Sequence, residues 1–180
     1  MCLFGEKGKY NEEDIPDATS FYGRSKAIGE IINERSLTLR TSIVGPDVNP
    51  NGIGLFNWFM KQTGQIKGYN KAIWTGVTTL QLAKSIETVF ENDVSGLYHL
   101  VNNATINKYD LLHLFKKHMD KDDVEIQEYD GYASDKSLVN NRNDFDFNIP
   151  SYEQMVSEMS DWIHDHKDLY ENVVLSRCRR

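Results

Sequence analysis

Hydrophobic positions along the chain change between two spacings, and this change predicts short strands that alternate with amphipathic helices. Apolar and β-branched runs predict strands at residues 2–4, 37–44, 72–75, 96–101 and 124–128. Runs with a helical period predict helices at residues 21–35, 55–62 and 108–119, and two more that open at Thr78 and Ser151. Alternation of this kind predicts an α/β layer architecture with some parallel pairing.

Capping residues and apolar stripes add detail to these helices. The pairs Thr78–Gln81 and Ser151–Gln154 have the spacing of a capping box, and Asn107 can cap the helix that follows it. Each helix is expected to turn one apolar face toward the core. The predicted faces are Ala27, Ile28, Ile31 and Ile32; Leu82, Ala83, Ile86, Val89 and Phe90; Leu111, Leu112, Leu114 and Phe115; and Tyr152, Met155, Met159, Trp162 and Ile163.

Composition and charge narrow the class of protein. The 180 residues are 39% hydrophobic and 26% charged, which is typical of a soluble globular protein with a core of its own. The net charge of -7 argues against nucleic acid or an anionic membrane as a partner, because phosphate binding needs a basic face. Cys2 and Cys178 are too few for a disulfide framework, and no run resembles a signal peptide or a membrane span. We therefore expect a cytoplasmic protein.

The segment SFYGRSKAIGEI, residues 20–31, carries the candidate chemistry. Tyr22 and Lys26 are four residues apart, so on a helix they share one face. A free phenol has a pKa of about 10, and a neighbouring ammonium stabilises its phenolate. A tyrosine tuned in this way can protonate an alkoxide when hydride reaches a carbonyl carbon.

The spacing alone is weak support for a catalytic pair. Tyr132 also stands four residues before a lysine, Lys136, in an irregular segment where we interpret the match as chance. For most such pairs the simpler interpretation is an aromatic side chain beside a solvated lysine. The five histidines are scattered, so no metal site is predicted, and no arrangement suggests a nucleophilic triad.

The context of Tyr22 and Lys26 resembles the extended short-chain dehydrogenases, and more narrowly the sugar-nucleotide reductases of the dTDP-4-dehydrorhamnose reductase type. The likeness covers nearly the whole chain in six ordered segments: FGEKGKYNEEDIPDATSFYGRSKAIGE, LTLRTSIVGP, GLFNWFMKQ, IKGYNKAIWTGVTTLQLAKSIE, GLYHLVNNATINKYDLLHLF and DKSLVNNRNDFDFNIPSYEQMVSEM.

The resemblance implies a fold and roles for particular residues. The fold would be the C-terminal part of a Rossmann-like doubly wound sheet plus a substrate-binding subdomain, with residues 1–45 from the catalytic region and residues 46–180 mostly from the substrate-binding part. Tyr22 would be the general acid, and Lys26 would tune it and contact the cofactor ribose. The segment Ser42, Ile43 and Val44 would lie beside the nicotinamide of the cofactor. Contacts to the nucleotide sugar would come from Arg40, Thr41, Trp74, Thr78, Asp135 and Ser137.

One part of the family pattern is absent from this sequence. These enzymes resemble one another in seating the cofactor pyrophosphate on a Gly-rich turn after the first strand. Here Gly52 and Gly54 lack that context, and Asn57 stands where a third glycine is needed. The family's catalytic Ser or Thr would fall before Met1. We therefore expect a fragment or truncated form. The intact family uses NADP or NAD as its cofactor, and binding of no cofactor by this chain alone is left open as an alternative. The expected partner is a separate cofactor-binding half or a second copy in a homo-oligomer.

Three functions remain open at this stage. The first is an NAD(P)H-dependent reductase of a nucleotide-activated 4-keto sugar in polysaccharide biosynthesis, weakly active or inactive alone. The second is a noncatalytic module that binds a nucleotide sugar or regulates another protein. The third is a nucleotide-sugar epimerase or dehydratase, which would use the same tyrosine and lysine.

Overall fold

The computed structural model describes residues 5, 7–49 and 51–170, so the strand predicted at residues 2–4 and both cysteines lie outside the described residues. The helices are α1 (Phe21–Ile28), α2 (Leu55–Met60), α3 (Thr79–Glu91), α4 (Lys108–His118) and α5 (Tyr152–Asp165), followed by the 3-10 turn η1 (Lys167–Leu169). The strands are β1 (Leu37–Arg40), β2 (Ile43–Val44), β3 (Gly64–Tyr69), β4 (Ala72–Trp74), β5 (Val77–Thr78), β6 (Gly96–His99), β7 (Ile106–Asn107), β8 (Val124–Tyr129) and β9 (Ser134–Asp135).

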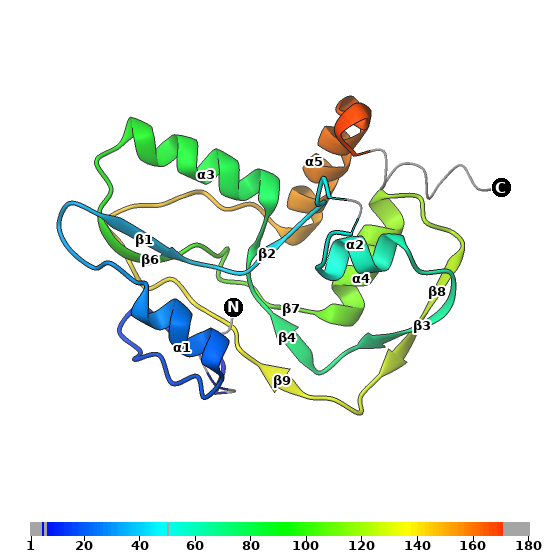
Figure 1. Cartoon of the computed structure of the whole chain (residues 1–180), viewed down its shortest axis with the longest axis horizontal. Coiled ribbons are helices and arrows are strands. Elements are labelled where there is room, and N and C mark those ends of the chain that lie inside the picture. The colour runs from blue at the N-terminus through cyan, green and yellow to red at the C-terminus, as the bar shows by residue number, and fades with distance from the viewer. Residues whose placement is uncertain (1–4, 6, 50, 171–180) are drawn as a thin grey trace.

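Parallel pairing dominates the small sheets, which confirms the predicted α/β class. β1 pairs with β6, from Leu37 opposite Gly96 to Arg40 opposite His99. β2 pairs with β5, and β3 pairs with β8 over six residues. β4 lies between β7, which is antiparallel to it, and β9, which is parallel. Figure 1 shows α3 above the β1–β6 pair and α1 below it, so helices lie on both sides of these strands.

The strand predicted at residues 37–44 needs correction, and four strands, β3, β5, β7 and β9, have no predicted counterpart. The strand predicted at residues 37–44 is divided into β1 and β2, because residues 37–40 pair with β6 whereas residues 43–44 pair with β5, where the Ser42 carbonyl accepts a hydrogen bond from the Val77 N–H at 2.9 Å. β3 is the longest of these four strands. Its sequence, GQIKGY, has two glycines and a lysine and shows no alternating apolar pattern, so its strand form depends on pairing with β8.

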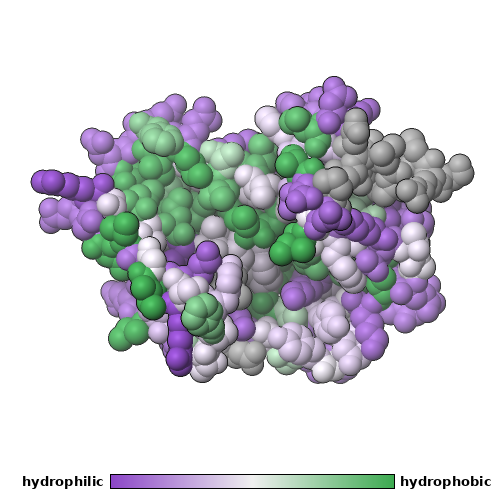
Figure 2. Space-filling model, viewed as in Figure 1, coloured by the Kyte–Doolittle hydropathy of each residue, from purple (hydrophilic) through white to green (hydrophobic). Residues whose placement is uncertain are grey.

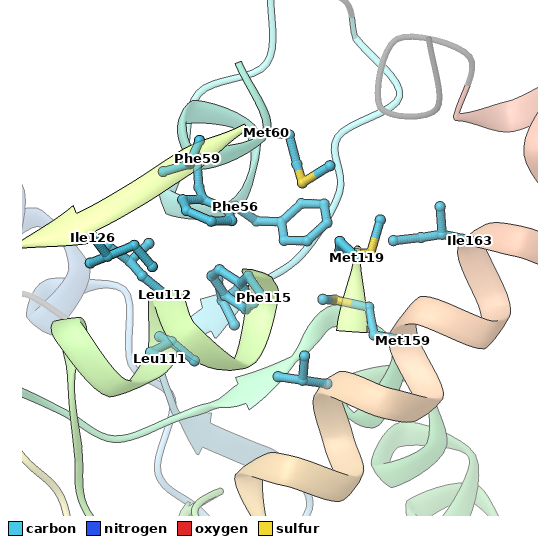
Figure 3. Close-up of a cluster of buried hydrophobic side chains, with 13 residues drawn as sticks. Phe56, Phe59, Met60, Leu111, Leu112, Phe115, Met119, Ile126, Met159 and Ile163 are labelled. Carbon is cyan, nitrogen blue, oxygen red and sulfur yellow. The ribbon is translucent and has the colours of Figure 1, made fainter. Parts of the chain in front are cut away.

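The main hydrophobic core joins α2, α4, α5 and β8 (Figure 3). Phe115 of α4 is fully buried and packs edge-to-face against Phe56, with 5.2 Å between the ring centroids. The predicted inward positions of α4 and α5 are mostly confirmed, since Leu111, Leu112, Phe115, Met155, Met159 and Ile163 are all buried. Trp162 is an exception because 40% of its surface is exposed.

The predicted buried stripe after Tyr22 is wrong. α1 ends at Ile28, and the segment up to Arg35 is not helical. Ile28, Ile31 and Ile32 are 86%, 59% and 60% exposed, and only Ala27 packs against a core cluster. Helical spacing identifies an apolar face but not what covers it, and no described element covers these three side chains.

The predicted inner face of α3 is also partly wrong. Phe90 is 86% exposed, Ile86 is 41% exposed, and Ala83 is exposed, whereas Gln81 and Ser85 are the buried residues of this helix. Figure 2 shows hydrophobic side chains gathered on this face over α3 and the neighbouring β1. Within the described residues, no helix has the length and apolar character needed to cross a membrane.

Phe115→Ala is expected to destabilise the protein by about 3–5 kcal/mol, because it removes a large aromatic side chain from a fully buried position and leaves a cavity. Urea denaturation followed by circular dichroism measures the effect. The matched control is Phe90→Ala, which changes the same residue type on an exposed surface and should shift the unfolding free energy by less than about 0.5 kcal/mol. Equal effects of the two substitutions would contradict the assignment of the core.

Candidate active site

α1 presents Tyr22 and Lys26 together at the protein surface. Ser20 caps this helix by accepting a hydrogen bond from the Gly23 N–H at 3.1 Å, which begins the helix just before Tyr22. The two side chains lie on one face, as the spacing predicts, with the Lys26 ammonium 5.4 Å from the centroid of the Tyr22 ring. Tyr22 is 59% exposed, so its hydroxyl is accessible to a ligand.

A cleft of about 550 Å³ lies beside this pair. Its lining includes seven of the residues chosen from the sequence: Tyr22, Lys26, Arg40, Thr41, Ser42, Ile43 and Trp74. They come from α1, from the break between β1 and β2, and from β4, which are distant in sequence. The fold therefore brings the predicted proton donor beside residues predicted to contact cofactor and sugar, although those roles stay predictions.

Gly76 explains why the β1–β2 break and β4 meet in this cleft. A Cβ atom at Gly76 would lie 2.1 Å from the Ser42 carbonyl oxygen and 2.6 Å from the Trp74 ring. Only a residue without a side chain allows this approach. The Thr41 hydroxyl, on the other side of the break, donates a hydrogen bond to the Leu100 carbonyl at 2.8 Å.

A buried ion pair fixes the end of α1 against β1. The Glu30 carboxylate, two residues beyond α1, accepts hydrogen bonds from Arg40 Nε at 2.7 Å and from its Nη2 at 2.9 Å. The side chains of Arg40 and Glu30 are only 3% and 11% exposed. The bidentate geometry restrains both position and orientation, because two parallel hydrogen bonds must be kept. Arg40 lines the cleft, but this guanidinium is already engaged by Glu30; its predicted sugar contact stays a prediction.

His99 extends this network across the sheet. Its Nδ1 lies 2.9 Å from the Val139 carbonyl and 3.1 Å from the Tyr10 carbonyl, so we assign the proton to Nδ1 as the donor. Its Nε2 faces the Arg40 guanidinium at 3.4 Å and accepts there. Burial lowers the pKa of His99, an effect that the nearby charge of Glu12 opposes and that of Arg40 supports. The imidazole is therefore neutral in the folded protein at neutral pH.

Four predicted site residues lie outside this cleft. Val44 is buried in the main core, and the Thr78 hydroxyl caps α3 by accepting from the Gln81 N–H at 3.1 Å. The Ser137 hydroxyl is fully buried and accepts from the Lys9 N–H, while Asp135 accepts from the Ser137 N–H. These structural roles account for their positions, and their predicted ligand contacts stay predictions.

A second, smaller hollow of about 180 Å³ adjoins the cleft, because Ser42 and Trp74 line both. Its other lining residues include Lys108 at the start of α4 and Lys136 just after β9, together with Tyr132 and Ser134. Nothing in the sequence singles out Lys108, and the spacing of Lys136 from Tyr132 is interpreted above as chance, although Lys136 lies between the predicted contacts Asp135 and Ser137. A lysine at a helix start and another in an irregular segment carry no spacing signal that could have joined them.

The fold family implies a nicotinamide dinucleotide, and the described residues fit only one end of it. Lys26, with the backbone of Ser42 and Ile43, could hold the nicotinamide ribose beside Tyr22. A pyrophosphate needs open backbone at a glycine-rich turn before a helix. Gly52, before α2, is closed to a ligand, since a Cβ there would lie 2.4 Å from the Asn57 amide nitrogen. Among the described residues, no three His, Cys, Asp or Glu side chains gather as metal ligands would.

Parallel strands with helices on both sides, and an exposed Tyr–Lys pair beside a cleft, are the features of a Rossmann-like short-chain dehydrogenase. Residues 4–160 match the family model described as the RmlD substrate binding domain, and the chain belongs to that family. It is thus similar to dTDP-4-dehydrorhamnose reductases, as the sequence segments predict. No curated protein sequence matches the chain.

Solved structures support the same fold. A dTDP-4-dehydrorhamnose reductase ortholog from Clostridium acetobutylicum superposes with a TM-score of 0.73 at 16% identity, over 91% of this chain and 63% of that protein. The dTDP-4-dehydrorhamnose reductase from Bacillus anthracis, solved with NADP, superposes with a TM-score of 0.69 at 17% identity, over 88% of this chain and 61% of that protein. A UDP-N-acetylglucosamine 4-epimerase from Methanobrevibacter ruminantium superposes with a TM-score of 0.67 at 15% identity, over 91% of this chain and 60% of that protein. The chain thus spans about six tenths of the length of these enzymes.

Lowering the pH from 7.5 to 5 is expected to reduce stability through His99. Its folded pKa is lowered while the unfolded histidine titrates near pH 6.5, so below that pH the unfolded state binds more protons. The stability that neutral His99 contributes is present above about pH 6.5 and is lost as the pH falls toward the folded pKa. His99→Asn should flatten this part of the profile in urea titrations at each pH.

The control for this experiment is His113→Asn, at an exposed position on α4. It should leave the slope between pH 7.5 and 5 as in the native protein. The depressed carboxylate pKa values of Glu153 and Glu158 act in a lower pH window, below about pH 4.5, and do not confuse the comparison. An unchanged slope in His99→Asn would show that the imidazole is not buried in its neutral form.

Proposed function

We propose that this chain supplies the proton donor and the sugar-binding side of an NAD(P)H-dependent reductase that acts on a nucleotide-activated 4-keto sugar. The observation that carries the proposal is the exposed Tyr22–Lys26 pair beside a 550 Å³ cleft in a member of this family. The reaction would take place in the cytoplasm and would serve the synthesis of polysaccharide precursors.

In the proposed reaction, the residues of this chain handle the proton. The nicotinamide, when bound, supplies a hydride to the C4 carbonyl carbon. The Tyr22 hydroxyl donates its proton to the carbonyl oxygen, which becomes the new hydroxyl group of the sugar. The tyrosine is left as a phenolate, whose negative charge the Lys26 ammonium offsets until a proton returns from solvent. Thr41 and Trp74 line the cleft where the sugar would lie.

The chain by itself is proposed to be a weak catalyst. Its described residues fit the nicotinamide end of a dinucleotide but provide no seat for the pyrophosphate, and positioning of the reactants supplies much of an enzyme's rate enhancement. A separate cofactor-binding half is the proposed partner. Support comes from β1, which among the described strands pairs only with β6, and from the exposed Ile28, Ile31 and Ile32 close to it. An open sheet edge flanked by apolar side chains is suited to strand addition.

Tyr22→Phe is expected to reduce turnover at least about 100-fold, because it removes the proton donor and leaves the ring in place. The assay mixes the full chain, at a concentration comparable to that of the substrate, with NADPH and a dTDP-4-keto-6-deoxy sugar, and follows loss of NADPH absorbance and formation of the reduced sugar. Tyr109→Phe is the matched control, since Tyr109 packs against the main core, away from the cleft, and its substitution should leave turnover unchanged. Turnover that Tyr22→Phe does not change would reject the assignment.

The two alternative functions give different results in the same experiment. Calorimetric binding of the nucleotide sugar, with neither NADPH binding nor turnover, would favour a noncatalytic module. Conversion of the sugar without net consumption of NADPH would favour an epimerase or dehydratase, a group whose members include structural neighbours of this chain.

A further inference from the structure

A groove of about 960 Å³ lies between α3 and α5, which contact each other. None of the residues that line it also lines the cleft beside Tyr22. Lys84 of α3 and Glu158 of α5 join the two walls through an ion pair at 2.6 Å. The apolar lining residues are Leu80, Ala83, Ile86 and Phe90 of α3 and Trp162 of α5.

Trp162 is held in a fixed orientation in the wall of this groove. Its ring is stacked on the His166 ring, with 3.9 Å between the centroids and 19° between the planes. The His166 Nδ1 also lies 2.9 Å from the Trp162 carbonyl oxygen. Trp162 nevertheless keeps 40% of its surface exposed. An indole that is already restrained loses little side-chain entropy when an apolar group packs against it.

The rim of the groove is acidic. Besides Glu158, its lining includes the exposed carboxylates Glu87, Glu91, Asp161 and Asp165. None of these four forms an ion pair with any residue in the described part of the chain. An apolar groove with carboxylates along its rim is complementary to a segment that carries both apolar side chains and cations.

The sequence that follows the last described residue has this composition. Residues 171–180 are ENVVLSRCRR, in which the apolar run Val173, Val174 and Leu175 precedes three arginines within four positions. This is the densest basic cluster of a chain whose net charge is -7. The apolar run matches the centre of the groove, and the arginines match its acidic rim.

The length of this tail is sufficient to reach the groove. Tyr170 packs against the main core, on a different side of α5 from Trp162 and Asp165. A helix with its side chains is about 10 Å across, and an extended chain advances about 3.3 Å per residue. Three or four residues beyond Tyr170 therefore cross α5 and bring Val174 and Leu175 to the groove. The next five residues span about 17 Å, enough to place the arginines along the rim.

We propose that residues 171–180 bind in the groove between α3 and α5 of the same chain. Val174 and Leu175 pack against Trp162, and the arginines lie along the acidic rim. Phe90 is ten residues beyond Leu80 on α3, about 15 Å at 1.5 Å per residue, so it lies beyond the apolar contact. The tail thus covers apolar surface on α5 and offsets the charge of the rim. This inference does not rest on the proposed reductase function.

The test is cleavage of the full chain after Arg177 by an arginine-specific protease, with loss of residues 178–180 followed by intact-mass spectrometry. An isotope-labelled peptide ENVVLSRCRR in the same reaction gives the rate for an unbound tail. The native tail should be cleaved at least about 10-fold more slowly than the peptide, because cleavage requires the released form. Trp162→Ser and Glu87→Lys should each raise the rate toward that of the peptide. The matched control is Asp122→Lys, a charge reversal in the exposed turn before β8, which should be cleaved as slowly as the native chain.

Two further measurements complete this test. Leu175→Ser leaves the groove intact and should also raise the rate, measured against a peptide with the same substitution, while circular dichroism confirms that each variant is folded. Salt near 1 M, where the Debye length is about 3 Å, should speed cleavage of the native tail relative to the peptide. A native tail cleaved as fast as the peptide, or groove variants as slow as the native chain, would overturn the proposal. Protection that increases with protein concentration would reject binding within one chain and would indicate the tail of a second copy.

Discussion

The bidentate pair between Glu30 and Arg40 is the interaction on which the candidate site depends. α1 has only eight residues, too short to be stable without tertiary contacts, and most of its side chains face solvent. The segment that follows it is held against β1 by this buried pair, with His99 of β6 behind the guanidinium, while Ala27 packs against a small core cluster. Loss of either partner would leave a buried charge uncompensated, which typically costs about 3–5 kcal/mol. Tyr22 and Lys26 are therefore placed beside the cleft through a contact that neither of them makes.

The second constraint is the close approach at Gly76. It allows the break between β1 and β2 to lie against Trp74, and this contact forms the shared wall of the cleft and the lysine-lined hollow. The side of the cleft opposite α1 is thus formed by residues that meet through this close approach.

Several large apolar side chains are exposed around α1 and on α3. Ile28 ends α1, Ile31 and Ile32 follow it, and Ile86 and Phe90 belong to α3; all five are exposed. Figure 1 shows α1 and α3 on opposite sides of the β1–β6 pair. The solved reductases are longer, and this chain covers 61–63% of two of them. Exposed apolar surface of this kind supports the proposed cofactor-binding partner.

Much of the local structure could be predicted from the amino-acid sequence. Caps at Thr78, Asn107 and Ser151 begin the helices that were expected there, since a side-chain oxygen and a backbone N–H three residues later meet through local geometry alone. The shared face of Tyr22 and Lys26 follows in the same way from helical periodicity.

Long-range packing decided the rest. β3 forms because β8 pairs with it, and the burial of an apolar face on α1 or α3 depends on which element lies opposite. Arg40 was chosen as a sugar contact from its place in a motif, but only the fold shows that Glu30 already engages its guanidinium. Lys108 and Lys136 come together through the pairing of β4 with β7 and β9. A linear sequence records each residue's chemistry and near neighbours, whereas the meeting of distant residues is decided when the sheets and helices pack.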